Sequence, residues 1–182
     1  LKTPAGQPAR DYLARRQLTA QTVTRFGLGF APDTWDSLVR AMKALGYSEQ
    51  ELFDGGLVRH GRSGGVYDTF RNRLMFPVID VRGNVIGFSG RILGDGEPKY
   101  MNSPETIVFS KSHNLFALNL AKKSKCGYII LAEGNIDVAS LHQAGFDSAV
   151  ASLGTSLTPE QARLLSRYTS EIVIAYDNDG AG

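Results

Sequence analysis

The sequence predicts an α+β subdomain over residues 1–125, followed by an α/β subdomain with a parallel sheet over residues 126–182. Three observations carry this prediction. Short helix signals fill the first third of the chain, two β-rich runs joined by a turn occupy the middle, and apolar strands alternate with helices at the end. With 182 residues, 42% of them hydrophobic, the chain can bury one good core or two small cores packed together.

Four short helices are predicted in the first third of the chain. Their ends carry residue types that favour helix starts and stops, namely Pro8, Thr19, Gly46, and the capping-box pair Ser48 and Glu51. Tyr12 and Leu13 fall on a common side of the first helix. The third helix carries an apolar stripe made of Leu38, Met42 and Leu45. We therefore expect these helices to pack one side against a core.

The middle of the chain changes to a β pattern. Residues 74–80 and 85–92 are rich in β-forming residues, and the turn residues 82–84 between them predict a hairpin. Two glycines inside the second run indicate a bulge or a close approach to the backbone. A polar stretch over residues 94–112 then leads to a predicted helix at about residues 115–122.

The last part of the chain alternates strands and helices. Apolar strands are predicted at residues 127–132, 148–151 and 171–176, with helices at residues 136–144 and 158–168 between them. Continuous apolar strands that alternate with helices are typical of a parallel sheet covered on both faces. The sequence therefore predicts an open α/β unit here.

Charge is unevenly distributed along the chain. Residues 59–125 carry eleven Lys and Arg against five Asp and Glu, whereas residues 126–182 carry two against seven, within an overall net charge of +2. A basic middle beside an acidic end indicates one region that holds a polyanion and another that holds cations. From composition alone, chance drift of charge on solvated faces explains the asymmetry equally well.

Composition also excludes several classes of protein. With Cys126 as the single cysteine, neither a disulfide framework nor a cysteine-based zinc site can form, and a reducing, cytoplasmic compartment is expected. The apolar runs, such as residues 128–132, are too short to span a bilayer, so no membrane partner is expected. The chain starts at Leu1 rather than Met and ends directly after an acidic cluster, which indicates a fragment.

Acidic residues follow two of the predicted strands. Glu133 comes directly after one strand, Asp177 and Asp179 follow another, and Asp137 lies one helical turn after Glu133. Because ligands of open α/β sheets bind at the carboxyl ends of strands, these carboxylates are expected in one crevice. Carboxylates that share a crevice repel one another unless cations join them, and hard oxygen ligands suit Mg²⁺ or Mn²⁺. The alternative is that they cap helices and form turns, which fits Asp137 alone better than the two matched strand ends.

Two sets of motifs resemble known families. The strand, Glu133-Gly134 and helix, followed by a strand and Asp177-x-Asp179-Gly180, resemble the Toprim domain of primases, topoisomerases and some nucleases. The segments RNRLMFP (71–77), GNVIGFSGR (83–91), PKYMNSPE (98–105), GNIDV (134–138) and ASLGT (151–155) resemble the RNA polymerase core of DnaG-type bacterial DNA primases. This match runs through nearly the whole chain. Asn135 departs from the tyrosine that the family often has.

The resemblance implies both a fold and an activity. Residues 1–125 would be the N-terminal subdomain of a primase catalytic core, and residues 126–182 the first part of a Rossmann-like Toprim domain. The implied enzyme is a DNA primase, a DNA-directed RNA polymerase that copies single-stranded DNA into short RNA primers by two-metal nucleotidyl transfer. The family carries a further pair of acids on a later strand, so the fragment itself is expected to be inactive.

The resemblance also assigns roles to single residues. Glu133, Asp177 and Asp179 are implied as catalytic carboxylates that hold the metals, with Asp137 as a further ligand. The residues implied to bind nucleotide and DNA are Arg16, Arg71, Arg73, Arg91, Lys99, Tyr100, Asn102 and Lys111. Arginine forks suit triphosphates, and an aromatic ring beside a cation suits a stacked base. For Arg16, an ordinary surface arginine on a helix is an equal explanation.

Cofactors and partners follow from the same resemblance. Two Mg²⁺ or Mn²⁺ ions are implied for the complete enzyme, with zinc only in a separate N-terminal module absent here. The implied partners are template DNA, ribonucleoside triphosphates, a single-stranded DNA-binding protein, and a replicative helicase bound through an absent C-terminal domain, all at the replication fork. Two alternatives stay open: a binding module without turnover, and a Toprim nuclease or topoisomerase, which would need a nucleophilic tyrosine in another domain.

Overall fold

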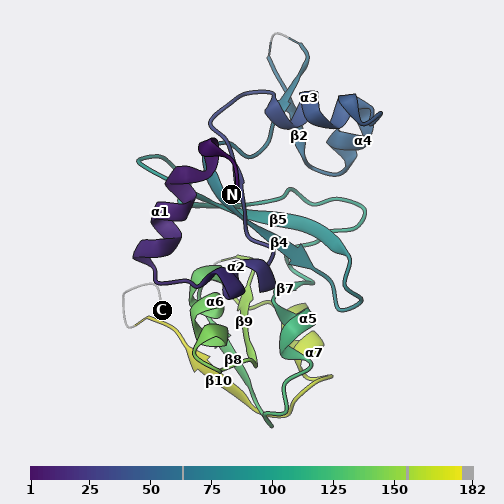
Figure 1. Ribbon diagram of the computed structural model, residues 1–182. Coiled ribbons are helices and arrows are strands. Elements are labelled where there is room, and N and C mark those ends of the chain that lie inside the picture. Colours follow the sequence, from purple (N-terminus) through teal and green to yellow (C-terminus); the bar gives the residue numbers. More distant parts are fainter. Residues whose placement is uncertain (63, 155, 178–182) are drawn as a thin grey trace.

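The computed structural model describes residues 1–62, 64–154 and 156–177. Its two larger sheets lie one above the other in Figure 1. The upper sheet belongs to the N-terminal part of the chain and the lower sheet to the C-terminal part. This arrangement confirms the predicted order of an α+β region followed by an α/β region.

Short helices precede and flank the upper sheet. They are the 3-10 turn η1 (Pro4–Gly6), α1 (Gln7–Arg15), α2 (Ala20–Arg25), α3 (Ser37–Ala44) and α4 (Glu49–Asp54). The Thr19 side chain accepts a hydrogen bond from the Thr22 backbone N–H at the start of α2, and Ser48 and Glu51 form both halves of a capping box on α4. The predicted helix starts at Thr19 and Ser48 are therefore confirmed.

The upper sheet is antiparallel, in the order β1-β4-β5-β6. Its strands are β1 (Gly29–Ala31), β4 (Arg73–Ile79), β5 (Val85–Ile92) and β6 (Tyr100–Asn102), and a separate hairpin pairs β2 (Val58–His60) with β3 (Val66–Asp68). The predicted turn between β4 and β5 is confirmed, with Gly83 at φ +100°. Backbone N–H groups of Asn84 and Arg82 donate to Asp80 across this turn and lower the pKa of Asp80 to about 2.

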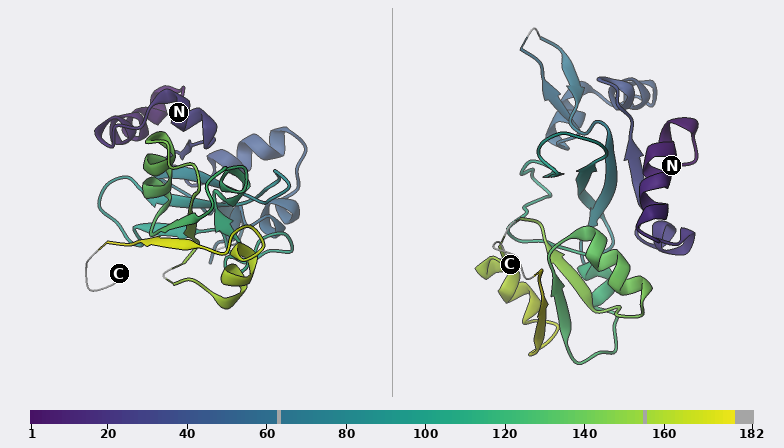
Figure 2. Two further views of the ribbon diagram at one scale, coloured as in Figure 1. Left: turned by 90° about the horizontal axis from the view of Figure 1, so that it is seen from below. Right: turned by 90° about the vertical axis from the view of Figure 1, so that its left-hand side faces the viewer.

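The lower sheet has the order β10-β8-β9-β7. Its elements are β7 (Leu115–Phe116), α5 (Leu118–Ala121), β8 (Ile129–Ala132), α6 (Asn135–Gln143), β9 (Ala149–Ser152), α7 (Pro159–Leu165) and β10 (Ile172–Ala175). Strands β8, β9 and β10 are parallel, and β7 joins β9 antiparallel. Figure 2 shows α6 and α7 on opposite faces of this sheet. The parallel α/β unit is therefore confirmed.

Several local expectations were wrong. The predicted helix at residues 115–122 begins as β7, and Ala117 at φ +65° separates that strand from the short α5. Leu45 is 73% exposed rather than part of a buried stripe, and α3 buries Val39 instead. The lower sheet was predicted to be covered on both faces. This is correct for β8 and β9, whose residues are all buried, but the residues of β10 are exposed.

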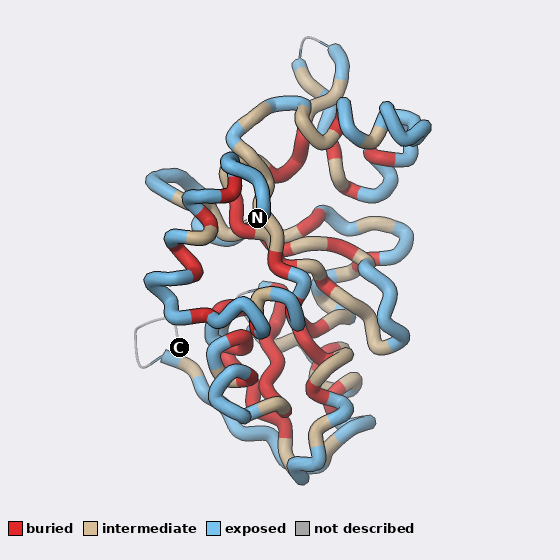
Figure 3. Tube along the Cα trace, viewed as in Figure 1, coloured by how far each residue is buried: buried red, intermediate tan, exposed pale blue. Residues whose placement is uncertain are grey.

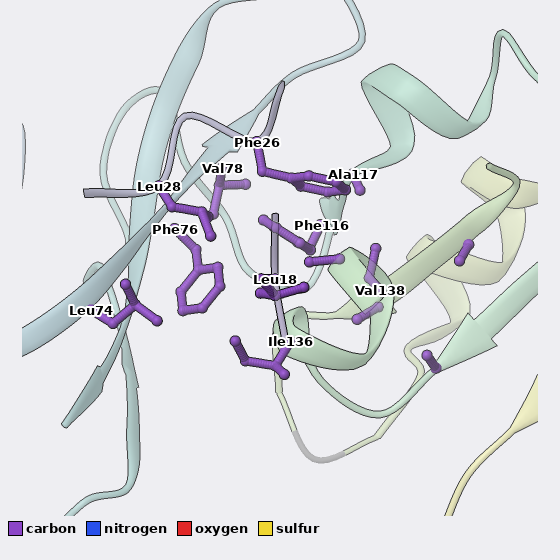
Figure 4. Close-up of a cluster of buried hydrophobic side chains, with 14 of the residues drawn as sticks. Leu18, Phe26, Leu28, Leu74, Phe76, Val78, Phe116, Ala117, Ile136 and Val138 are labelled. Carbon is purple, nitrogen blue, oxygen red and sulfur yellow. The ribbon is translucent and has the colours of Figure 1, made fainter. Parts of the chain in front are cut away.

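One hydrophobic core joins the two sheets. Phe116 from β7 stacks on Phe26 at 5.8 Å between ring centroids and meets Phe76 of β4 edge-on at 6.0 Å. Ile136 and Val138 of α6 belong to the same buried cluster (Figure 4). Figure 3 shows buried positions running from the upper sheet into the lower one. The two parts of the chain therefore share their core, and burial of this apolar surface holds one against the other.

Polar contacts also cross between the two parts. The Gln143 side chain at the end of α6 donates to the Gln17 carbonyl oxygen at 2.8 Å, and it accepts from the Thr19 backbone N–H and the Thr22 hydroxyl, each at 2.8 Å. Asn102 of β6 donates to the Leu153 carbonyl oxygen at 2.6 Å. Within the described ranges, each helix is too short or too polar to cross a membrane.

Candidate functional site

The carboxyl ends of β8 and β10 bring two acidic residues to one edge of the lower sheet. Ala132 of β8 pairs with Ala175 of β10, so Glu133 and Asp177 leave neighbouring parallel strands at almost the same level. Burial raises the pKa of Tyr176, and the nearby charge of Glu133 raises it further. The strand-end position inferred from the sequence is therefore the position found.

Asp137 faces the same place from the first turn of α6. Desolvation of its carboxyl group raises the pKa of Asp137, and the charge of Asp177 raises it further. A side chain at Gly134, the N-cap of α6, would come within 3.0 Å of the Asp137 carboxylate. Glycine at this position thus lets the carboxylate lie against the backbone.

The donor set at this edge fits a hard divalent cation. It consists of carboxylate oxygens of like charge; burial raises the pKa of Asp137 and the charge of Asp177 raises it further, a repulsion that a cation relieves. In the part of the chain that the structure describes, no three His, Cys, Asp or Glu side chains are close enough to hold a metal ion by themselves. Asp179 lies outside the described residues. Water and substrate phosphates would have to supply further ligands.

Two arginines of the predicted set gather around one tyrosine beside these carboxylates. Arg16 donates from Nε to the Tyr12 hydroxyl at 3.1 Å, and the Arg91 guanidinium carbon lies 4.3 Å from the centre of the Tyr12 ring. Arg91 also lies 5.9 Å from the Tyr100 ring. The hydrogen bond to Tyr12 raises the pKa of Arg16, and the charge of Asp137 adds to this shift. Arg16, Arg91 and Tyr100 therefore form one group next to Asp137.

Arg71 contacts a different pair of aromatic rings. Its guanidinium carbon lies 4.2 Å from the centre of the Trp35 ring and 5.1 Å from that of Tyr67. The two rings meet edge to face at 5.5 Å between centroids. They also line a hollow of about 520 Å³ against the β2–β3 hairpin. Arg71 is thus part of a separate cation–aromatic cluster and does not join the group around Tyr12.

Arg73 is buried inside the upper sheet. It is 5% exposed, and its Nη1 donates to the carbonyl oxygens of Gly90 and Pro98, each at 3.0 Å. Burial lowers the pKa of Arg73, and the nearby charge of Arg71 lowers it further. In this conformation the Arg73 guanidinium holds the loop around Pro98 onto β5, and its role in nucleotide binding stays a prediction.

The three remaining residues predicted to bind nucleotide or DNA, Lys99, Asn102 and Lys111, lie in different surroundings. Lys99 is exposed next to Tyr100, which is 38% exposed. The side chain of Asn102 is used in the hydrogen bond to Leu153 described above. Lys111 is exposed, and its carbonyl oxygen accepts a hydrogen bond from Gln161 of α7 at 2.9 Å. Lys99 is therefore the lysine placed beside the Arg91 and Tyr100 group.

Sequence reasoning missed three aromatic residues at these places. Tyr12 was expected only as a core residue, although its ring contacts Arg91 and its hydroxyl contacts Arg16. Trp35 and Tyr67 were not singled out. The one available signal was that Trp35 is the single tryptophan of the chain and lies in a polar turn just before a helix.

Comparisons with known proteins assign both parts of the chain to known families. The family model for the DNA primase catalytic core, N-terminal domain, matches residues 1–122, and the Toprim domain model matches residues 127–182. The DNA primase of Clostridium acetobutylicum is 52% identical over 175 residues, which cover 96% of this chain and 29% of that protein. The chain therefore spans about a third of the length of the curated relatives it matches.

Solved structures give the same result. The Escherichia coli primase catalytic core is 42% identical, with a TM-score of 0.92, over 100% of this chain and 59% of that one. A DnaG primase catalytic domain solved with bound single-stranded DNA is 43% identical, with a TM-score of 0.88, over 100% of this chain and 59% of that one. The fold described above is thus that of primase catalytic cores over its whole length.

Proposed function

The chain belongs to the DNA primase catalytic-core family, and on that premise we propose that its protein synthesises short RNA primers on single-stranded DNA. One observation carries the proposal. Glu133 and Asp177 follow β8 and β10 at one edge of the lower sheet, and Asn102, two residues after Tyr100 in β6, bonds to Leu153 at the end of the neighbouring strand β9, so oxygen ligands for a cation and the Arg91 and Tyr100 group share one edge. Loss of primer synthesis on substitution of Asp177 tests it.

In the proposed site, carboxylates bind the cations and arginines bind the nucleotide. Glu133, Asp137, Asp177 and Asp179 would hold divalent cations, which, when bound, stabilise negative charge on phosphate and activate the attacking hydroxyl. Arg16 and Arg91 bind the triphosphate of the incoming ribonucleotide through their guanidinium forks, because neither is engaged with an acid in the described residues. The primer 3′-hydroxyl then attacks the α-phosphate and pyrophosphate leaves.

The template is proposed to follow the basic middle of the chain. Residues 59–125 carry the excess of Lys and Arg, and they include Lys99 beside the site and Arg71 on the Trp35 and Tyr67 rings. Trp35 is 66% exposed, so part of its ring is free to stack on a base. Contacts with a replicative helicase and a single-stranded DNA-binding protein are proposed for the whole protein at the replication fork.

We expect single-stranded DNA to bind with an affinity that falls steeply with salt, because phosphate contacts release counterions. The Lys99→Ala variant should weaken binding of all sequences alike, as loss of a phosphate contact does. Fluorescence anisotropy at several salt concentrations measures both effects, with Lys125→Ala, another exposed lysine, as the matched control. An affinity that stays flat between low and moderate salt would contradict the electrostatic account.

The Trp35→Ala variant is expected to lower the affinity for single-stranded DNA by about tenfold, since it removes a stacking surface for one base. The exposure of Trp35 keeps this change away from the core. Tyr47→Ala removes another exposed aromatic side chain, 47% exposed, and should leave the affinity unchanged. Equal affinities for the two variants would show that the template does not contact the Trp35 and Tyr67 rings.

A further inference from the structure

Tyr12 is buried in the hydrophobic core, and its side chain also contacts arginines. It lies in α1 and is 7% exposed, and it belongs to the main hydrophobic cluster. Three guanidinium groups surround its ring: Arg91 at 4.3 Å, Arg16 at 5.7 Å and Arg15 at 6.0 Å from the ring centre. Its hydroxyl accepts the hydrogen bond from Arg16 Nε at 3.1 Å.

These arginines are held without a neutralising acid. The ion pairs between described residues lie elsewhere, at Arg40, Lys43, Arg82 and Arg163. Asp11 and Asp95 line the same hollow as Tyr12 and Arg91, yet neither forms an ion pair with an arginine there. Arg91 donates from Nη1 to the Ile92 carbonyl oxygen at 3.0 Å, and its buried Nε has no partner among the described residues.

Holding a guanidinium by an aromatic ring differs from holding it by a carboxylate. A carboxylate would fix the side chain but would also cancel its charge toward any further anion. The negative face of a phenol ring attracts the guanidinium while the full positive charge remains. The arrangement around Tyr12 therefore keeps two arginines in fixed positions and keeps them able to bind an anion.

The charged ends of these arginines lie beside the carboxylate edge of the lower sheet. Asn102, two residues along β6 from Tyr100, donates to the Leu153 carbonyl oxygen at 2.6 Å. Leu153 directly follows β9, which pairs with β8 next to Glu133. Arg91 reaches the same edge through Tyr100, whose ring centre lies 5.9 Å from the Arg91 guanidinium carbon. An anion bound by both arginines would thus lie next to cations bound by Asp137 and Asp177.

We propose that Tyr12 is a positioning residue of the nucleotidyl-transfer site, whose ring orients Arg91 and whose hydroxyl orients Arg16 for the triphosphate of the incoming ribonucleotide. The proposal rests on the function proposed above. A residue that only filled the core would need neither the hydroxyl group nor the guanidinium groups stacked around it. Leucine or phenylalanine would serve packing alone, and this difference makes the role testable.

The test measures primer synthesis by the full-length protein against ribonucleotide concentration, at saturating template and metal. Tyr12→Phe keeps the ring and removes the hydroxyl, so we expect KM for ribonucleotide to rise by about threefold to tenfold, with kcat within about twofold. Tyr12→Leu also removes the ring, and we expect a rise of well over tenfold. Thermal unfolding of each variant reports its folding, and Tyr12→Phe decides the question where Tyr12→Leu fails to fold.

Two further variants separate positioning from packing. Tyr128→Phe makes the same chemical change in a tyrosine that packs against the same core but directly precedes β8, at the end opposite Glu133, and its KM should be unchanged. Tyr12→Phe combined with Arg16→Ala should be no worse than Arg16→Ala alone, because the hydroxyl acts through Arg16. Unchanged KM in folded Tyr12→Phe, or additive effects in the double variant, would overturn the proposal.

Asp177→Asn in the same assay separates this proposal from the function on which it rests. An active Asp177→Asn variant would show that the nucleotidyl-transfer site is misplaced, and the role of Tyr12 would fail with it. If Asp177→Asn is inactive and the Tyr12 variants keep their KM, only the role of Tyr12 is wrong. If Asp177→Asn is inactive and Tyr12→Phe raises KM, both are supported.

Discussion

Replacing Asp177 by asparagine, or Glu133 by glutamine, is expected to remove nearly all primer synthesis from the full-length protein. Each change keeps the size of the side chain and removes one negative charge from the strand-end edge where β8 and β10 meet. An amide is a much poorer ligand for Mg²⁺ or Mn²⁺ than a carboxylate, and preorganised charge at a transfer site accounts for roughly a hundredfold or more in rate. We therefore expect a loss of at least that size in kcat.

The measurement is primer synthesis on a single-stranded template with saturating metal and ribonucleotide. Glu171→Gln is the matched control, because Glu171 is an exposed acid at the opposite end of β10 and is expected to keep full activity. Near-normal synthesis by Asp177→Asn or Glu133→Gln under these conditions would show that the site lies elsewhere on the molecule.

The parts of the fold that sequence reasoning found are those with strong local signals. The apolar strands β8 and β10 and the capping box at Ser48 and Glu51 are each defined by neighbouring residues. The strands it missed, β1, β2, β3, β6 and β7, have two or three residues each. Such strands show no period of their own and exist because a distant segment pairs with them, as β4 does with β1.

The residues of the site likewise fall into those that the sequence could predict and those that it could not. The acids could be placed because parallel strands end at a common edge, a rule that needs only the strand assignments. The arginines could not be sorted, because sequence does not tell which side chain turns inward. Arg73 and Arg91 lie on neighbouring strands, yet Arg73 packs under Gly90, where a side chain would come within 2.9 Å of Arg73 Cδ. The role of Tyr12 was missed because its helical position predicts only burial against the core. The pattern does not show that the hydroxyl group contacts an arginine at the edge of that core.

This chain by itself is expected to make no primers, even with template, ribonucleotides and metal. It covers 59% of the Escherichia coli primase catalytic core, and no three acids of its described residues are close enough to hold a metal ion. Apolar side chains of β10 also lie open, with Ile174 66% exposed, so the strand that carries Asp177 lacks cover on that side. A catalytic group displaced by about an ångström can cost on the order of a hundredfold in rate.

The competing expectation is that the family's further pair of acids on a later strand only increases the affinity for metal. A high metal concentration would then restore primer synthesis by this chain. Incubation of the purified chain with a single-stranded template, labelled ribonucleotides and a manganese titration separates the two, since weak binding is overcome by concentration whereas a misplaced carboxylate is not. The full-length protein in the same mixture confirms that the substrates are competent. A dinucleotide product that rises with manganese and disappears in Glu133→Gln would show that the carboxylates of this chain suffice for catalysis.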